Sequence, residues 1–230
     1  MKRSIYAGHR FPPEIIEYGV WLYLRFCLSY RDVEDILARR GVDVTYETVR
    51  RWILKFGPIF ARRLRGRRPA PTGRWHLDEM YVSINGNRFY LWRAVDDEGE
   101  VLDILVQRRR DKGAALRLMR KLLRKTGVRP DSVTTDKLRS YASALRDLGL
   151  GARHVTGGRS NNRAENSHQP VRCKERCMKG FKSPATAQIT LAAHAVIYNA
   201  FKIQRHLISR KTLRLSRVAA QAEWRRAVAD

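Results

Sequence analysis

Apolar residues recur at helical spacing near the start of the chain. Tyr18, Leu22 and Phe26 lie four positions apart, which predicts an amphipathic helix. A proline pair, Pro12-Pro13, precedes this run. Proline suits a first helical position because its missing N–H has no helical partner there in any case. We therefore expect the first helix to begin at this pair.

Two further helices are predicted from their capping residues. Ser29 is a suitable N-cap, and Asp32 occupies the reciprocal position of a capping box, although glutamate is more usual there. Thr45 is expected to cap a third helix that reaches Phe56, after a short turn at 41–44 that contains glycine. A helix, a short turn and a second capped helix form the helix-turn-helix pattern.

The outward face of the third predicted helix is basic. In a helix-turn-helix that binds DNA, the start of this helix meets base edges and its cationic flank meets phosphates. A plain three-helix bundle with a solvated basic face is the alternative, and the pattern favours DNA binding over it. The candidate DNA contacts in this helix are Tyr46, Arg50, Arg51 and Lys55.

After about residue 72 the hydrophobic pattern changes to that of strands. Three strands joined by two short connections containing glycine are followed by alternating helices and strands, an order typical of an α/β domain with one mixed sheet. The expected strands are 75–84, 88–96, 101–107, 132–136 and 152–155. The expected helices are 111–125, 140–148, a region from about 162, and 184–206.

These elements predict five segments along the chain. The boundaries rest on the change of periodicity and on an arginine-rich stretch with prolines that resembles a linker. The segments are a basic tail at 1–13, an all-α helix-turn-helix domain at 14–57, a basic linker at 58–72, an α/β domain at 73–206 and a basic helical tail at 207–230.

Charge narrows the class of partner. The 47 lysines and arginines exceed the 22 acidic residues, which gives a net charge of +25, and a nucleic acid is the polyanion expected to neutralise it. Charge alone does not separate DNA from RNA. The sequence contains no long apolar span, signal peptide or lipidation motif. Three cysteines in an uninformative spacing fit a reducing compartment, so we expect a cytoplasmic, nucleoid-associated protein.

Three acidic residues fall where a phosphodiester-cutting enzyme needs them. Asp78 and Asp136 interrupt or end apolar strand-like runs, and Glu165 begins a helical stretch. Buried carboxylates are costly unless a positive charge pairs with them. Two Mg²⁺ ions about 3.5–4 Å apart can activate a nucleophile and stabilise a leaving oxygen. Carboxylate oxygens are the ligands that Mg²⁺ prefers, and Mn²⁺ is the expected substitute.

Each acid also has a structural interpretation. Glu79 could be the ligand in place of Asp78, and because strand neighbours point to opposite faces, only one of the two is expected to face the site. Asp136 could cap the following helix, and Glu165 could be a helix-surface acid paired with a nearby arginine such as Arg172. A zinc site at His168, Cys173 and Cys177 is disfavoured because a fourth ligand at matched spacing is missing.

Taken in order, several motifs resemble those of the DDE transposases of the IS6 insertion-sequence family. The resemblance covers roughly residues 10–206. The motifs that carry it are Ser29-Tyr30-Arg31-Asp32-Val33, Arg51-Trp52, Trp75-His76-Leu77-Asp78-Glu79-Met80-Tyr81-Val82, Tyr90-Leu91-Trp92-Arg93-Ala94-Val95-Asp96, Thr135-Asp136-Lys137, Asn161-Asn162-Arg163-Ala164-Glu165 and Gly180-Phe181-Lys182-Ser183.

The resemblance implies a fold and a set of roles. The domain at 73–206 is expected to be an RNase H-like catalytic domain, with Asp78, Asp136 and Glu165 as the DDE triad, which favours Asp78 over Glu79. Arg172 matches a basic residue that the family carries after the glutamate. Members recognise terminal inverted repeats and insert by replicative transposition. The interval from Asp136 to Glu165 is shorter here than in the best-known members.

The leading hypothesis is therefore a magnesium-dependent DNA transposase that cuts element ends at the 3′ side and joins them to target DNA. Lys137, beside Asp136, is a further candidate DNA contact. At least a homodimer is expected because two DNA ends must be brought together. The alternatives are a helix-turn-helix regulator without chemistry, a catalytically decayed transposase copy, and an RNase H-like nuclease that cuts without joining.

Overall fold

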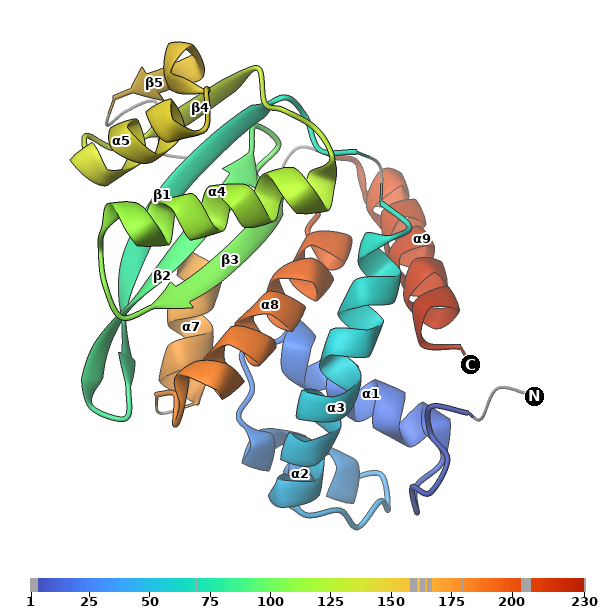
Figure 1. Ribbon diagram of the computed structural model, residues 1–230. Coiled ribbons are helices and arrows are strands. Elements are labelled where there is room, and N and C mark those ends of the chain that lie inside the picture. The colour runs from blue at the N-terminus through green and yellow to red at the C-terminus, as the bar shows by residue number, and fades with distance from the viewer. Residues whose placement is uncertain are drawn as a thin grey trace. The chain divides into compact units, whose positions relative to one another are not determined.

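The computed structural model of the chain divides into two compact units (Figure 1). The helical unit comprises Met1–Arg68 and Ala192–Asp230, and the sheet unit comprises Pro69–Leu191. The structure describes residues 4–68, 70–157, 161, 164, 167–178, 180–203 and 208–229.

The helical unit begins with three helices, as the sequence predicts. They are α1 (Pro13–Arg25), α2 (Tyr30–Ala38) and α3 (Tyr46–Arg65). The capping box at the start of α2 is confirmed, because the Ser29 hydroxyl accepts from the Asp32 N–H at 3.1 Å and the Asp32 carboxylate accepts from the Ser29 N–H at 2.7 Å. The expected N-cap of α3, Thr45, is confirmed as well.

The third helix is longer than its local sequence predicts. We expected it to end at Phe56, before a linker, yet α3 continues through Pro58 to Arg65. Proline inside a helix removes one backbone hydrogen bond. Packing offsets that loss, because Phe60 lies edge-on to Trp224 of α9 (Arg210–Val228) with ring centroids 5.4 Å apart. The buried face of α3 is thus continuous across the segment that resembles a linker.

Both ends of the chain contribute to the core of the helical unit. Tyr6, in the segment expected to be a tail, is buried and donates a hydrogen bond from its hydroxyl to the Val228 carbonyl oxygen at 2.8 Å. Its ring stacks on Phe56 at 5.2 Å between centroids. The expected basic tails therefore contain structural contacts that neither segment could form alone.

The sheet unit contains one mixed sheet of five strands. The strands are β1 (Arg74–Ile84), β2 (Asn87–Asp96), β3 (Val101–Gln107), β4 (Ser132–Thr135) and β5 (His154–Thr156). Their order is β3-β2-β1-β4-β5. The pairs β1–β2 and β2–β3 are antiparallel, whereas β1–β4 and β4–β5 are parallel. The predicted α/β class with one mixed sheet is therefore confirmed.

Helices pack on the sheet through an apolar core. In Figure 1, α4 (Lys112–Thr126) crosses the sheet, with α5 (Arg139–Asp147) near β4. This core includes Trp75, Trp92 and Tyr141. The Asp111 side chain caps the start of α4, and the C-cap residue is Gly127, whose φ of 68° suits a residue without a Cβ.

The remaining elements complete the sheet unit and lead out of it. A short 3-10 helix, η1 (Gly151–Arg153), precedes β5. Next along the chain come α7 (Gln169–Cys177) and α8 (Pro184–Phe201), and the unit boundary falls within α8. No helix within the described ranges combines the length and apolar character needed to cross a bilayer.

Candidate active site

The site forms where the parallel pairing of β1 with β4 ends, partway along β1. The paired register of β1 and β4 runs to Leu77 opposite Thr135, so the next residues along the two strands are Asp78 and Asp136. One carboxylate oxygen from each of these acids and one from Glu79 all lie within 4.8 Å of one another. The structure thus brings together two of the three predicted acids. Glu165 lies outside the described residues.

Glu79 reaches this cluster although it alternates with Asp78 along β1. We expected only one of the two side chains to face the site, and the structure shows this expectation to be wrong. The physical reason is that β4 ends at Thr135. Asp136 therefore lies beyond the paired ladder, where side chains from either face of β1 can approach it. Strand alternation still holds within the ladder itself.

Glu79 occupies the enclosed side of the cluster. Its side chain is only 1% exposed, and its carboxylate accepts from the Tyr141 hydroxyl at 2.8 Å and from the Arg110 guanidinium at 2.5 Å. Burial raises the pKa of Glu79 and nearby Asp136 adds to the shift, while Tyr141 and Arg110 oppose it. Glu79 is thus a buried acid with bonded partners on its own side of the strand.

Arg110 links two of the carboxylates. Its guanidinium lies 3.4 Å from Asp136 Oδ2 as well as contacting Glu79. The other oxygen of Asp136 accepts from the Leu138 N–H at 3.0 Å. This bond resembles the capping role considered for Asp136. However, α5 begins at Arg139 with Leu138 as its N-cap and no side-chain cap, so Asp136 stabilises the turn before the helix.

Asp78 lies on the opposite side of β1 from Glu79, close to His168. Its side chain is 13% exposed, and His168 Nδ1 lies 3.7 Å from its Oδ2. Burial and the guanidinium groups of Arg93 and Arg172 lower the pKa of His168 to about 4. His168 is therefore neutral at pH 7, and its contact with Asp78 is not an ion pair there.

A buried frame of polar residues surrounds this side of the strand. Arg93 pairs with Asp78 in the β1–β2 register, is 2% exposed, and donates from Nε to the Ser167 hydroxyl at 2.8 Å. Asn161 is 1% exposed and donates from its amide to the Leu77 carbonyl oxygen at 2.9 Å. Hydrogen bonds of this kind, between segments far apart in the sequence, fix the backbone on which Asp78 lies.

These residues suit a hard divalent cation. The cluster offers carboxylate oxygens, which are the ligands that Mg²⁺ and Mn²⁺ favour. The buried Oδ1 of Asn161 also has no hydrogen-bond partner among the residues that the structure describes. Buried oxygens without partners are costly, and a cation or its water shell would satisfy them. The donor set therefore fits a divalent metal.

Arg172 connects α7 to β1, the strand that carries Asp78. Its guanidinium donates to the Tyr81 carbonyl oxygen of β1 at 3.0 Å and lies 3.5 Å from Glu175 of the same helix. Glu175 in turn accepts from the Ser83 N–H at 3.1 Å. These bonds attach α7 to the strand that carries Asp78. The side chain remains 47% exposed.

The predicted DNA-contacting side chains differ in how strongly they are held. Arg50 binds Glu47 of the same helix at 2.6 Å, whereas Arg51 lies 3.9 Å from Glu47 and is 75% exposed. Lys55 lies 2.7 Å from the His9 ring nitrogen. The ring of Tyr46, 40% exposed, stacks beneath an arginine, and Lys137 is exposed beside the acid cluster.

Sequence reasoning did not identify several residues that shape the cluster. Arg110 and Tyr141 lie 31 and 62 positions from Glu79 in sequence, and no local pattern marks them as contacts of Glu79. Asn161 and Arg93 were present in the motifs but carried no assigned role. A buried arginine opposite Asp78 in a predicted hairpin register was a signal that could have been used.

Comparisons with known proteins show relatives over most of the chain. A family model described as a DDE domain matches residues 72–204. The transposase for insertion sequence-like element IS431mec of Staphylococcus aureus is 32% identical over 201 residues, which cover 85% of this chain and 88% of that protein. The transposase for insertion sequence element IS257 in transposon Tn4003, also of Staphylococcus aureus, matches to the same extent.

Similarity to solved structures is more distant. The chain resembles a component of a simian T-cell lymphotropic virus intasome with a TM-score of 0.42 and 16% identity. That match covers 54% of this chain and 49% of the other. The family match spans more than half of the chain, and the identity with the curated transposases covers most of both partners. The chain therefore belongs to the DDE transposases of the IS6 insertion-sequence family.

Proposed function

We propose that this transposase binds the terminal inverted repeats of its element, cuts at the 3′ ends and joins them to target DNA by replicative transposition. The observation that carries the proposal is the meeting of Asp78 and Asp136 just beyond the last paired residues of β1 and β4, with carboxylate oxygens within 4.8 Å. Acids gathered in a chain of net charge +25 are poorly explained as surface charge.

In this proposal Asp78, Asp136 and Glu165 hold two Mg²⁺ ions, and Mn²⁺ is a substitute. When bound, such ions supply Lewis-acid stabilisation of the attacking and leaving oxygens. Glu79 lies in the same cluster but is already bonded to Tyr141 and Arg110. We therefore assign Glu79 the role of positioning Arg110, and the ligand role to Asp78.

The chemistry proceeds in two displacements at phosphorus. First, a water oxygen attacks the phosphate at the element end, the bond between phosphorus and the 3′ oxygen breaks, and a 3′-OH is released. Second, that 3′ oxygen attacks a phosphate of the target strand, a new P–O bond forms, and the target's own 3′ oxygen leaves. His168, neutral at pH 7, and Arg93 and Arg172 hold the scaffold around Asp78 during both steps.

The helix-turn-helix supplies recognition of the element ends in this proposal. The N-terminal half of α3 presents Tyr46 and Arg51 to solvent. Of the two arginines that contact Glu47, Arg51 is the more exposed. Arg50 and Lys55 are proposed to contact DNA along the same helix. Lys137 is proposed to contact DNA beside the acid cluster. Replacing Arg51 with alanine should weaken duplex binding and reduce its salt dependence by about one phosphate contact.

Two further elements of the proposal concern assembly and location. A homodimer or higher homo-oligomer on DNA is required because two element ends must be joined to one target. The protein is expected to act in the cytoplasm, in association with the nucleoid. Crosslinking with and without duplex DNA would show whether the ends promote assembly.

The decisive experiment is a strand-transfer assay with Mg²⁺ and DNA that flanks this gene. It compares the native protein with Glu165→Gln, Asp78→Asn and Asp136→Asn, each of which keeps the size of the side chain and removes its charge. Joined products from the native protein alone would support the triad. DNA binding by electrophoretic mobility shift should be equal in all four proteins, because the triad is not needed for recognition.

The alternatives give different products in the same assay. Binding without cutting by any protein, including the native one, would indicate a regulator or a decayed copy. Nicked DNA without joined products would indicate a nuclease. Substantial joining by one of the three variants would remove that residue from the proposed triad.

A further inference from the structure

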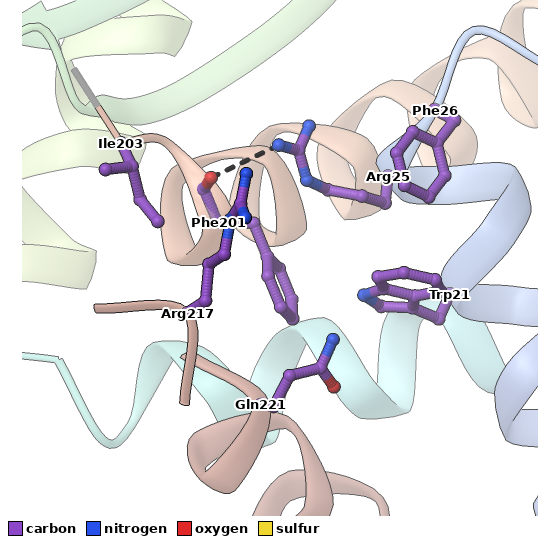
Figure 2. A pocket seen from close by; sticks show the side chains of 7 residues that line it. All are labelled: Trp21, Arg25, Phe26, Phe201, Ile203, Arg217 and Gln221. Carbon is purple, nitrogen blue, oxygen red and sulfur yellow. Dashed lines mark hydrogen bonds between the residues drawn. The ribbon is translucent and has the colours of Figure 1, made fainter. Parts of the chain in front are cut away.

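A cavity of about 440 Å³ lies within the helical unit, apart from the acid cluster (Figure 2). Its volume is within the range of about 300–1,000 Å³ that is typical of small-ligand sites. It lies between the end of α1, the end of α8 and the middle of α9. The residues that line it are Trp21, Arg25, Phe26, Phe201, Ile203, Arg217 and Gln221.

Aromatic rings form one part of the lining. Trp21 lies edge-on to Phe26 and to Phe201, with ring centroids 5.1 Å and 5.8 Å apart. Phe26 is 40% exposed, which is high for a phenylalanine within a folded unit. Aromatic faces that are open to solvent are platforms for the π-faces of nucleobases.

Polar side chains of the kinds that bind nucleotides form another part of the cavity lining. Arg25 donates from Nη2 to the Phe201 carbonyl oxygen at 3.2 Å, which holds its guanidinium at the cavity wall near the Phe26 ring. Arg217 is exposed and adds a second guanidinium, and the lining residues that the structure describes include no carboxylate. The cavity is therefore both cationic and aromatic.

Trp21, which lines the cavity, has a hydrogen-bond donor in its indole N–H. Its indole nitrogen is buried and has no hydrogen-bond partner among the described residues. In Figure 2 this nitrogen points to the side of the cavity where Phe201 and Gln221 lie. Buried donors without partners are costly and rare, so a ligand acceptor at this position would remove the cost.

The cavity continues a row of polar side chains along α9. Arg210, Arg214, Arg217 and Gln221 are three or four positions apart, which places them on one helix face. Arg210 and Arg214 line a second hollow near the start of α9. A strand whose phosphates follow this row would bring a nucleotide to the aromatic cavity.

We propose that this cavity binds one unstacked nucleotide of a single DNA strand, with its base among the aromatic rings and its phosphates along α9. The proposal rests on the DNA binding proposed above and adds a site that recognises single-stranded DNA. Single strands of this kind arise wherever element ends are cut or opened. Duplex DNA keeps its bases stacked and cannot enter a cavity of this kind.

The test measures tail preference, the ratio of dissociation constants for a blunt element-end duplex and for the same duplex with a tail of about six nucleotides, a length within the span that single-strand sites cover. Fluorescence anisotropy gives both constants. The native protein should bind the tailed DNA about tenfold more tightly, as expected for stacking of one base. Arg217→Gln and Gln221→Glu should reduce the preference to about twofold or less.

The matched control is Arg226→Gln, which removes one charge from an exposed position of α9 that lies off the row and does not line the cavity. It should weaken binding to both DNAs equally and leave the tail preference unchanged. Circular dichroism melting of every variant confirms that α9 remains folded. A tail that carries 5-iodouracil should crosslink on irradiation to a peptide containing Trp21 or Phe26.

The outcomes separate the two proposals. Native protein that binds blunt duplex but shows no tail preference overturns the cavity proposal and leaves the proposed function intact. The same conclusion follows if both cavity variants keep the native preference, or if the crosslinks map only outside the cavity. Native protein that binds neither DNA contradicts the proposed function, and the cavity proposal fails with it.

Discussion

Two groups of buried acids occupy the same sheet and have opposite surroundings. Asp103 on β3 is 3% exposed at its side chain and lies 3.2 Å from Lys121 and 2.8 Å from Lys125, both of α4. Partway along β1, by contrast, the carboxylates of Asp78 and Glu79 lie close to another acid, Asp136. Asp103 has two lysine partners of its own, whereas Glu79 and Asp136 share the guanidinium of Arg110 and lie close to a third acid, Asp78.

This difference teaches how to distinguish a structural acid from a functional one. A buried carboxylate that balances two ammonium groups is explained by the fold. Three carboxylates with oxygens within 4.8 Å of one another repel, and Arg110 brings one positive charge to two of them, so their arrangement points to a cationic ligand. The comparison predicts that removing charge at the two places has opposite effects on stability and on activity.

The largest expected effect is on activity at the acid cluster. Asp78→Asn and Asp136→Asn should each reduce strand transfer on the order of a thousandfold, because several kcal/mol of charge stabilisation are lost. Neither change should lower the free energy of unfolding, because each removes like-charge repulsion. Strand-transfer rates and urea denaturation measure the two quantities. A loss of stability without a loss of activity would contradict the assigned role.

Metal addition should have the next largest effect. Mg²⁺ or Mn²⁺ at one hundred times its dissociation constant should stabilise the native protein by about 2.7 kcal/mol, because the ion binds only the folded site. Thermal melting with and without the ion measures this. Asp78→Asn should abolish the shift and Asp103→Asn should retain it. An equal shift in all three proteins would show that the ion binds elsewhere.

Removing the structural acid should reduce stability by a smaller amount. Asp103→Asn leaves Lys121 and Lys125 near a buried site, and should lower the free energy of unfolding by about 2 kcal/mol. This is less than for a fully buried pair because both lysines retain some contact with water. Strand transfer per folded molecule should not change. Unchanged stability would show that the lysines hydrate fully once the acid is gone.

The same acid gives the stability a defined pH dependence. Burial alone would raise the pKa of Asp103, but the ammonium groups of Lys125 and Lys121 outweigh it and hold the pKa below its usual value. Because the folded-state pKa is depressed, this contribution is present above the ordinary pKa of about 3.8. It is lost as the pH falls through the lower folded-state value. Asp103→Asn should flatten this acid limb of the stability curve.

The smallest expected effect distinguishes the two neighbouring acids of β1. Glu79→Gln retains a group that can accept from Tyr141 but weakens the attachment of Arg110, so strand transfer should fall only about tenfold, or about 1.4 kcal/mol. The ratio of Glu79→Gln to Asp78→Asn activity is the measurement. If Glu79→Gln is the more damaging change, the ligand role moves from Asp78 to Glu79.

The sequence predicted most of the local structure because local structure depends on nearby residues. The capping box at Ser29, the N-cap at Thr45 and the hairpin strands follow from propensities and spacing within a few positions. Asp78 and Asp136 could be selected because each follows or interrupts a strand-like run. Glu165 was selected in the same way and stays a prediction, since it lies outside the described residues.

The sequence could not predict contacts that depend on how distant segments return to one another. The continuation of α3 through Pro58 depends on Phe60 meeting Trp224. Local pattern treated that stretch as a linker, because proline and arginine usually end a helix. Tertiary packing outweighs such propensities when it buries a continuous apolar face.

By itself, the sequence determined the element order, the basic character, the candidate acids and the family to which the chain belongs. The tertiary structure decided which acids meet, because β4 ends one residue before Asp136 and so exposes it to both faces of β1. It also decided that Arg110 and Tyr141 donate hydrogen bonds to Glu79. The physical reason is range: propensity and capping act within a turn or two, whereas a site is assembled by strand register and packing between segments far apart in the chain.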